Sequence, residues 1–370
     1  MFKSAFTGIL IIFCLSFMNI QKAYSEEKRP NIVFIFVDDM GYYDLSSYGA
    51  NEVNTTRIDK LAEEGILSTD SYGAVTNYIL SQQSLLKGSY IKKGDSIDIK
   101  KGNALEEYID LTYSAVGDIQ LKLDLHKPKN TDESLPAVVC IHGGGWYKGN
   151  RKGFGKVAKA LANNGFVAVT IDYRLSGVAP FPAQIQDCKA AVRWLRLNAD
   201  KYGIDASRIG AIGHSAGGHL VALLATSDGC AEIGAGDANN TISSRINAAV
   251  AMGAQTDFLS ERTKEVSSDP ERGQIWRQFM GGTQVQKPEL YRLASPLFHL
   301  DERDPPIAFI TGEFDDASTH AEMFRVEAEK MGVVSQFAII KDAPHFFIPD
   351  SEWFDLSMDW SISFLRENLK

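Results

Sequence analysis

Residues 210–224 read Gly-Ala-Ile-Gly-His-Ser-Ala-Gly-Gly-His-Leu-Val-Ala-Leu-Leu. Residues 209–212 form an apolar run short enough for a buried strand, and a helical apolar pattern begins at Leu220. The G-x-S-x-G pattern between them places Ser215 in a tight strand-to-helix turn, where glycines permit strain and unpaired helix N–H groups face a developing negative charge. The pattern alone also fits a glycine-rich turn with an incidental serine, but its flanking elements favour a nucleophile.

Alternating strand and helix patterns extend in both directions from this turn. A hairpin over residues 113–126 turns at Gly117-Asp118, and further strands are predicted at 137–141, 167–171, 248–252, 307–311 and 336–340. Helices are predicted at 154–164, 182–202, 319–331 and 353–369. Repeated strand–helix units indicate an α/β fold, with a mostly parallel central sheet covered by helices on both faces.

A nucleophilic serine needs a base, and on such a fold the histidine comes last in the chain. His320 and His345 both follow the predicted acid loop. His345 comes just after the strand at 336–340, at a strand's carboxyl end, where ligands bind in open α/β sheets. His345 is therefore the predicted base, although a surface histidine before a terminal helix has the same pattern. His320 is expected to lie in solvent at a helix start.

The acid is expected in the loop after the strand at 307–311. Glu313, Asp315 and Asp316 compete there. The Gly-x-x-Asp spacing favours Asp315, with Asp316 as the second choice. The acid would orient the imidazole and stabilise its protonated form.

An oxyanion hole is predicted from residues 142–146, His-Gly-Gly-Gly-Trp, which follow the strand at 137–141. Consecutive glycines let backbone N–H groups turn toward an oxyanion without obstruction by side chains. Ala216, directly after the serine, would add another N–H group. A merely flexible loop is the alternative, but the position after this strand favours the oxyanion hole.

These motifs together resemble an α/β-hydrolase of the esterase and lipase group that carries an HGGG motif, in its carbohydrate-esterase-like branch with feruloyl and acetyl esterases. The matching residues are 142–146, 172–175, 181–184, 187, 213–220, 294–296, 312–315 and 344–345. The resemblance covers residues 105–370 and implies oxyanion donors at Gly144, Gly145 and Ala216. The chain departs from it at Thr311, where many relatives have histidine, and at Asp316, where proline is common.

We therefore expect a serine carboxylic-ester hydrolase that needs no cofactor and acts on acetyl or feruloyl-type esters, of small molecules or of polysaccharides. An arylformamidase or a small-ester lipase is the alternative on the same scaffold, because triad chemistry cleaves both esters and amides. A hydrolase-like binding protein without activity is disfavoured by the intact Ser215 and His345. The net charge of −9 argues against nucleic acid as a partner.

The start of the chain has the pattern of a secretory signal peptide. Lys3 precedes an apolar run to about Met18, and small residues at Ala23 and Ser25 predict cleavage after Ser25. We therefore expect residues 1–25 to be removed, the protein to be secreted or periplasmic, and no membrane association after cleavage.

Residues 26–90 resemble the start of the sulfatase family in the stretches 30–33, 38–42 and 57–65. The resemblance implies calcium binding by Asp38 and Asp39, and it requires a cysteine or serine nucleophile precursor where this chain has Tyr78. We read the segment as a truncated sulfatase-like leader with vestigial metal ligands, so a calcium- or sulfate-binding module is a weak alternative. A polar linker is predicted at residues 91–104, and the hydrolase is expected to fold without the leader.

Beyond the predicted leader the chain has three cysteines, Cys140, Cys188 and Cys230. Cys140 lies in an apolar strand, which predicts a buried thiol. Cys188 and Cys230 could pair in an oxidising compartment, and the sequence leaves that open.

Overall fold

The computed structural model describes residues 60, 89–95, 98–129, 131, 133–234 and 241–370. The chain divides into two compact units, Met1–Gly65 and Ile66–Lys370. The predicted signal peptide and most of the sulfatase-like segment, with Asp38, Asp39 and Tyr78, lie outside the described residues. The strands and helices named next all belong to the second unit.

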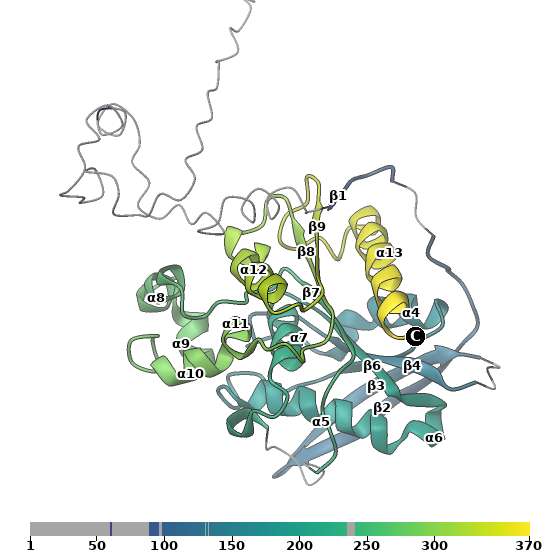
Figure 1. Cartoon of the computed structure of the whole chain (residues 1–370). Helices are drawn as coiled ribbons and strands as arrows, with labels where there is room; N and C mark the ends of the chain where they lie inside the picture. The colour runs from purple at the N-terminus through teal and green to yellow at the C-terminus, as the bar shows by residue number, and fades with distance from the viewer. Residues whose placement is uncertain (1–59, 61–88, 96–97, 130, 132, 235–240) are drawn as a thin grey trace, which may run out of the picture. The chain divides into compact units, whose positions relative to one another are not determined.

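A nine-stranded sheet forms the centre of this unit, in the order β1-β9-β8-β7-β6-β4-β5-β3-β2 (Figure 1). The strands are β1 (Ser89–Ile91), β2 (Leu105–Val116), β3 (Ile119–Pro128), β4 (Leu135–Ile141), β5 (Val167–Ile171), β6 (Ile204–His214), β7 (Ala248–Met252), β8 (Ile307–Gly312) and β9 (Ser335–Ile340). Only the β2–β3 and β3–β5 pairs are antiparallel. The mostly parallel sheet of the predicted α/β-hydrolase fold is confirmed.

Helices connect these strands and cover the sheet. The α-helices are α4 (Gly155–Asn163), α5 (Ala183–Leu197), α6 (Ala199–Tyr202), α7 (Ala216–Thr226), α8 (Glu261–Ser268), α9 (Gln274–Met280), α10 (Pro288–Ala294), α11 (Pro296–His299), α12 (Glu322–Lys330) and α13 (Ser351–Asn368). Short 3₁₀ helices are η3 (Arg151–Phe154), η4 (Ala231–Ile233) and η5 (Ala317–His320).

Both faces of the sheet are buried, and β4 shows how its sequence achieves this. Val139 and Ile141 belong to the apolar cluster that contains α5 and α7, whereas Val138 and Cys140 belong to the one that contains α4 and α13. Successive side chains of a strand point to opposite faces, so a strand covered on both sides must be apolar throughout. The uninterrupted apolar runs in the sequence are therefore the central strands.

The predicted strands and most of the predicted helices are confirmed, with a difference in one helix. The helix expected over 182–202 is two helices, α5 and α6, with a break at Asn198. The Asn198 side chain donates to the Trp194 carbonyl over 2.9 Å, and so shares this acceptor with its own backbone N–H, which donates over 3.0 Å. Asparagine competes with the backbone in this way, and the apolar pattern does not reveal it.

Four short helices, α8 to α11, fill the connection between β7 and β8 and were not predicted (Figure 1). Each has between four and eight residues, too few for a clear helical period. We call these four helices the cap helices. Arg262 of α8 contacts Asp316 in the loop that follows β8, where the acid is predicted.

The stretch predicted as a linker, residues 91–104, is fixed to the second unit by hydrogen bonds. β1 pairs in parallel with β9, and the Lys341 N–H donates to the Ile91 carbonyl over 2.8 Å. The Asn103 side chain donates to the Asn163 carbonyl at the end of α4, also over 2.8 Å. Ile91 thus holds the stretch to the β9 edge and Asn103 holds it to α4, while residues 96 and 97 lie outside the described part of the chain.

All three described cysteines are free thiols. Cys140 and Cys188 are fully buried and Cys230 is partly exposed. Desolvation raises the pKa of the Cys230 thiol, which makes it less reactive. Within the described residues, no helix is both long and apolar enough to cross a membrane.

We predict that β1, rather than the residues before it, is needed for stability. A chain beginning at Lys87 keeps β1, and it should unfold cooperatively near the temperature of the full chain. A chain beginning at Asn103 loses β1 and exposes the β9 edge, which is a template for aggregation. Thermal unfolding and light scattering of the two truncated chains provide the measurement. Equal melting temperatures for both would mean that β1 adds nothing to the sheet.

Candidate active site

Ser215 lies at the sharp turn between β6 and α7, with φ 58° and ψ −122°. Its N–H donates to the Met252 carbonyl at the end of β7 over 2.8 Å, which ties the turn to the sheet. The helix passes so close to the sheet that a Cβ on Gly217 would lie 2.1 Å from the Ile141 carbonyl oxygen. The G-x-S-x-G pattern is thus a steric requirement of this turn.

Three predicted residues meet at this turn and form a continuous hydrogen-bonded chain. His345 Nε2 lies 2.8 Å from Ser215 Oγ, and His345 Nδ1 lies 2.8 Å from Asp315 Oδ2. A carboxylate only accepts hydrogen bonds, so Nδ1 carries the proton and Nε2 is free to accept the serine proton. The side chain of His345 is 43% exposed, whereas that of Asp315 is 3% exposed. The base therefore faces solvent while the acid is sealed behind it.

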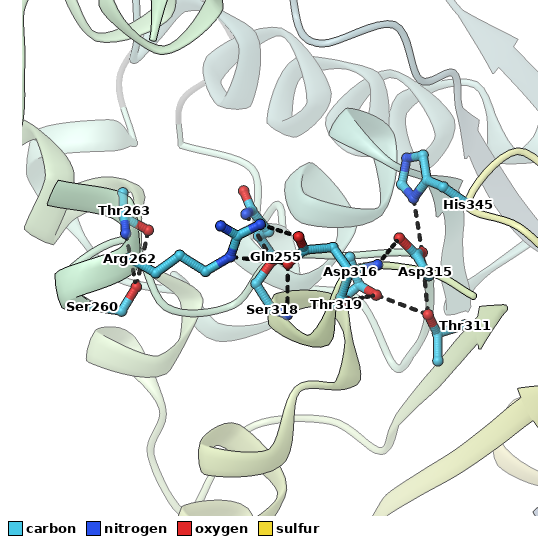
Figure 2. A network of polar contacts seen from close by, with 10 residues as sticks. All are labelled: Gln255, Ser260, Arg262, Thr263, Thr311, Asp315, Asp316, Ser318, Thr319 and His345. Atoms are coloured by element: carbon cyan, nitrogen blue, oxygen red, sulfur yellow. Dashed lines mark hydrogen bonds and ion pairs between the residues drawn. The ribbon is translucent and has the colours of Figure 1, made fainter. Parts of the chain in front are cut away.

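The surroundings of Asp315 keep its carboxylate charged. Burial has the largest single effect and raises the pKa of this carboxyl group. The hydrogen bond and charge of His345, together with hydrogen bonds from the Asp316 N–H and the Thr319 side chain, outweigh burial, and the pKa lies below its ordinary value. The Asp316 N–H donates to Asp315 Oδ1 over 2.6 Å, and Thr311 Oγ1 lies 3.2 Å from Oδ2. Figure 2 shows this arrangement.

Asp316, the second choice for the acid, is bound elsewhere. Its carboxylate forms an ion pair with Arg262 at the start of cap helix α8. It also accepts from the Ser318 N–H over 3.0 Å, as the N-cap of η5. Figure 2 shows Asp316 directed toward Arg262 and Asp315 directed toward His345. Asp315, the first choice from the Gly-x-x-Asp spacing, therefore lies beside His345, and Asp316 lies beside Arg262.

The predicted oxyanion donors lie on the turn after β4 and at the first residue of α7. Gly144 and Gly145 have φ 122° and 58°, and a Cβ on Gly144 would lie 2.2 Å from the Lys148 carbonyl oxygen. Neither glycine N–H donates a hydrogen bond to any described residue. The N–H of Ala216 begins α7 and so has no partner within the helix. These amides remain available to a ligand oxygen.

Two anchors hold the segment that follows the glycine turn of residues 143–145, and we call residues 143–151 the oxyanion loop. The Trp146 indole N–H donates to His219 Nδ1 over 3.1 Å. The Arg151 N–H donates to Asp172 Oδ1 over 2.8 Å, and Arg151 Nε donates to the buried Asp124 over 2.9 Å. The glycine turn is therefore held between the end of β4 and these two anchors.

An aromatic cluster behind this loop is the main feature that the sequence interpretation missed. The Trp146 ring stacks on Phe279 at 4.3 Å, and it also meets Trp276 and Phe258 edge-on. Trp276 and Phe279 lie three residues apart on α9, so they share one face of that helix. The spacing of Trp276 and Phe279 is the feature of the sequence that could have predicted this cluster. The cluster couples the cap helices to the oxyanion loop.

The other histidines near the serine are buried and neutral. Desolvation lowers the pKa of His214 and of His219 to about 4. His214 donates to the His345 carbonyl over 2.8 Å, and so it supports the backbone of the candidate base. The prediction that His320 is solvated is wrong, since it lies half-buried in η5 against Phe337. Short 3₁₀ helices pack closely on their neighbours, which the sequence pattern did not indicate.

Within the described residues, no three side chains of His, Cys, Asp or Glu are arranged to hold a metal ion. The metal candidates Asp38 and Asp39 fall outside this part of the chain. Calcium binding by them stays a prediction.

We predict that Gly217→Ala destabilises the fold, because the new methyl group overlaps the Ile141 carbonyl. Overpacking of this kind costs about 1–3 kcal/mol in the free energy of unfolding. Gly155→Ala is the matched control, since Gly155 has helical φ and ψ and open space around its Cβ position. Urea unfolding of both variants tests this, and a Gly217→Ala variant as stable as Gly155→Ala would contradict it.

Comparison with known proteins finds two families that match parts of this chain. Residues 123–326 match the BD-FAE family, 204 of the 370 residues, and residues 30–119 match the Sulfatase family. Esterase LipC of Mycobacterium tuberculosis is 32% identical over 224 residues, which cover 58% of this chain and 53% of LipC. The chain thus spans about half of that relative.

Two solved structures share the fold. A truncated carbohydrate esterase from gut microbiota superposes with TM-score 0.60 at 24% identity, over 75% of this chain and 99% of that one. Esterase Est2 of Thermogutta terrifontis superposes with TM-score 0.58 at 26% identity, over 70% of this chain and 91% of that one. Because the BD-FAE match spans more than half of the sequence and includes Ser215 and Asp315, the chain belongs to the BD-FAE esterase family, with a sulfatase-like segment before the esterase domain.

Proposed function

We propose that this protein is a serine carboxylic-ester hydrolase that acts through Ser215, His345 and Asp315. The observation that carries the proposal is the hydrogen-bonded chain from Ser215 Oγ through both nitrogens of His345 to Asp315. That arrangement has a base within reach of the nucleophile and a third group that orients the base, which is what acyl transfer requires.

In the proposed reaction His345 Nε2 accepts the Ser215 proton as Oγ attacks the ester carbonyl carbon. The negative oxygen that develops is stabilised by the N–H groups of Gly144, Gly145 and Ala216. His345 then protonates the alcohol as it leaves, and an acyl-serine remains. Water attacks this acyl group as His345 accepts its proton, and the bond between the acyl carbon and Ser215 Oγ then breaks. His345 returns the proton to Oγ, and the acid is released. None of these steps requires a cofactor.

Asp315 stabilises the imidazolium form of His345 during both halves of the reaction. The carboxylate is nearly sealed from solvent, so water screens its interaction with the imidazolium less than it would at the surface. Asp315 also keeps the proton on Nδ1, so that Nε2 faces the serine.

For the substrate we propose acetyl or feruloyl-type esters, with small molecules or polysaccharides as the alcohol. The BD-FAE family match and the carbohydrate esterase with the same fold support this choice. We also propose that the protein acts outside the cytoplasm, from the signal-peptide pattern of residues 1–25. Hydrolysis rates for acetyl, feruloyl and longer acyl esters on the purified protein test the substrate class, and cell fractionation tests the location.

We predict that Ser215→Ala lowers turnover of a 4-nitrophenyl acetate substrate by roughly a millionfold, and that His345→Ala does the same. The double variant should be little worse, because the two groups act as one unit. His320→Ala is the control, since this ring packs against Phe337 and the proposed mechanism gives it no role, so turnover should stay nearly unchanged. Near-normal turnover in either single triad variant would rule out the proposed mechanism.

We predict that Asp315→Asn lowers turnover about ten-thousandfold, because an amide stabilises the imidazolium poorly and favours the wrong tautomer. Asp316→Asn removes a carboxylate one residue away and should cost far less, since that group pairs with Arg262. Steady-state kinetics of the two variants provide the comparison. If Asp316→Asn lowered turnover more than Asp315→Asn, Asp316 would be the catalytic acid instead of Asp315.

A further inference from the structure

The carboxylate of Asp315 has a third hydrogen-bond partner besides His345 and the Asp316 N–H. Thr311, the fifth residue of β8, is fully buried, and its Oγ1 lies 3.2 Å from the same Oδ2 atom that accepts from His345.

A second threonine completes a short chain of hydroxyl groups. Thr319 in η5 is 5% exposed, and its Oγ1 lies 2.8 Å from Thr311 Oγ1 and 2.8 Å from the Asp316 carbonyl oxygen (Figure 2). Each hydroxyl has one proton to donate. The Thr319 side chain also hydrogen-bonds to the Asp315 carboxyl group and lowers its pKa. The two hydroxyl protons therefore have more acceptors than they can serve at once, and they point either toward Asp315 or away from it.

The charge on Asp315 decides the direction. If Thr311 donated to Thr319 instead, the carboxylate Oδ2 would lose a buried donor, which is costly for a charged group. If Thr311 donated to Asp315 while Thr319 donated to the Asp316 carbonyl, the two hydroxyl oxygens would face each other at 2.8 Å without a proton between them. With Thr319 donating to Thr311 and Thr311 to Asp315, every contact of the carboxylate is satisfied.

This direction leaves no other group unsatisfied. The Asp316 carbonyl keeps the Thr319 backbone N–H, which donates over 2.9 Å. Successive hydrogen bonds of this kind polarise one another, so Thr319 strengthens the donation by Thr311.

We propose that Thr311 is a positioning residue for the reaction, which holds Asp315 in the orientation that directs His345 toward Ser215, with Thr319 as its polarising partner. The inference rests on the proposed function, since it assigns Thr311 a role through Asp315. Thr311 does not touch the reacting atoms.

The test compares Thr311→Val with Thr311→Ser in the full chain, with 4-nitrophenyl acetate as the substrate. Valine keeps the shape of threonine and removes the donor, so kcat should fall about 10- to 100-fold, as expected for a hydrogen bond to a charged group, while KM stays within about twofold. Serine keeps the donor and should restore most of kcat. Thr170→Val is the matched control, because Thr170 is a buried strand residue whose hydroxyl has no partner in the described part of the chain.

A double-variant cycle separates positioning from packing. In an Asp315→Asn background, Thr311→Val should change kcat by less than about twofold, since its effect passes through the carboxylate. Thr319→Val should cost less than Thr311→Val, because Thr311 can still donate to Asp315 without it.

Three results would overturn the proposal. The first is that Thr311→Val and Thr170→Val have the same kcat while Ser215→Ala is inactive. That result would remove the role of Thr311 and leave the proposed function intact. The second is an equal loss from Thr311→Val with and without the Asp315 carboxylate, because it would indicate a packing effect alone. The third is an active Ser215→Ala variant, which would overturn the proposed function and this proposal with it.

Discussion

The backbone of Ser215 sits in a conformation that L-residues rarely adopt, at the point where β6 ends and α7 begins. Such a conformation costs about 1–3 kcal/mol and persists only where the surrounding structure enforces it. Here the Ser215 N–H is held by the Met252 carbonyl, while α7 lies directly against the end of β4 at Gly217. The strain lifts the hydroxyl group above the sheet and leaves the first amide of α7 facing the same space.

The rest of the site depends on that turn because the strands are parallel. The loops that carry Ser215, Asp315 and the oxyanion glycines all leave the sheet at its carboxyl-terminal edge. His345 reaches the same edge after β9, and its carbonyl is held by the buried, neutral His214 beside the serine. Residues 130 positions apart are thus aligned to within hydrogen-bonding distance by the order of the strands.

The cap helices tie this edge together from two sides. The aromatic cluster joins Trp146 on the oxyanion loop to Trp276 and Phe279 on α9. The Arg262–Asp316 ion pair joins α8 to the acid loop (Figure 2). This pair is roughly half exposed, and surface ion pairs contribute about 0–1 kcal/mol, so the aromatic packing holds the cap more strongly than the ion pair.

The sequence by itself determined the α/β class, the central strands and the tight turn at Ser215, because each depends on local rules. A strand buried on both faces must be apolar throughout. The turn between β6 and α7 lies so close to the sheet that only glycine fits at position 217. Only the tertiary structure decided the features that depend on contacts between distant segments. Asp315 and Asp316 are adjacent and chemically alike. Only the fold brings Asp315 to His345 and Asp316 to Arg262 on α8. Likewise, the addition of β1 to the sheet and the closing of the aromatic cluster depend on surfaces that exist only once the chain has folded.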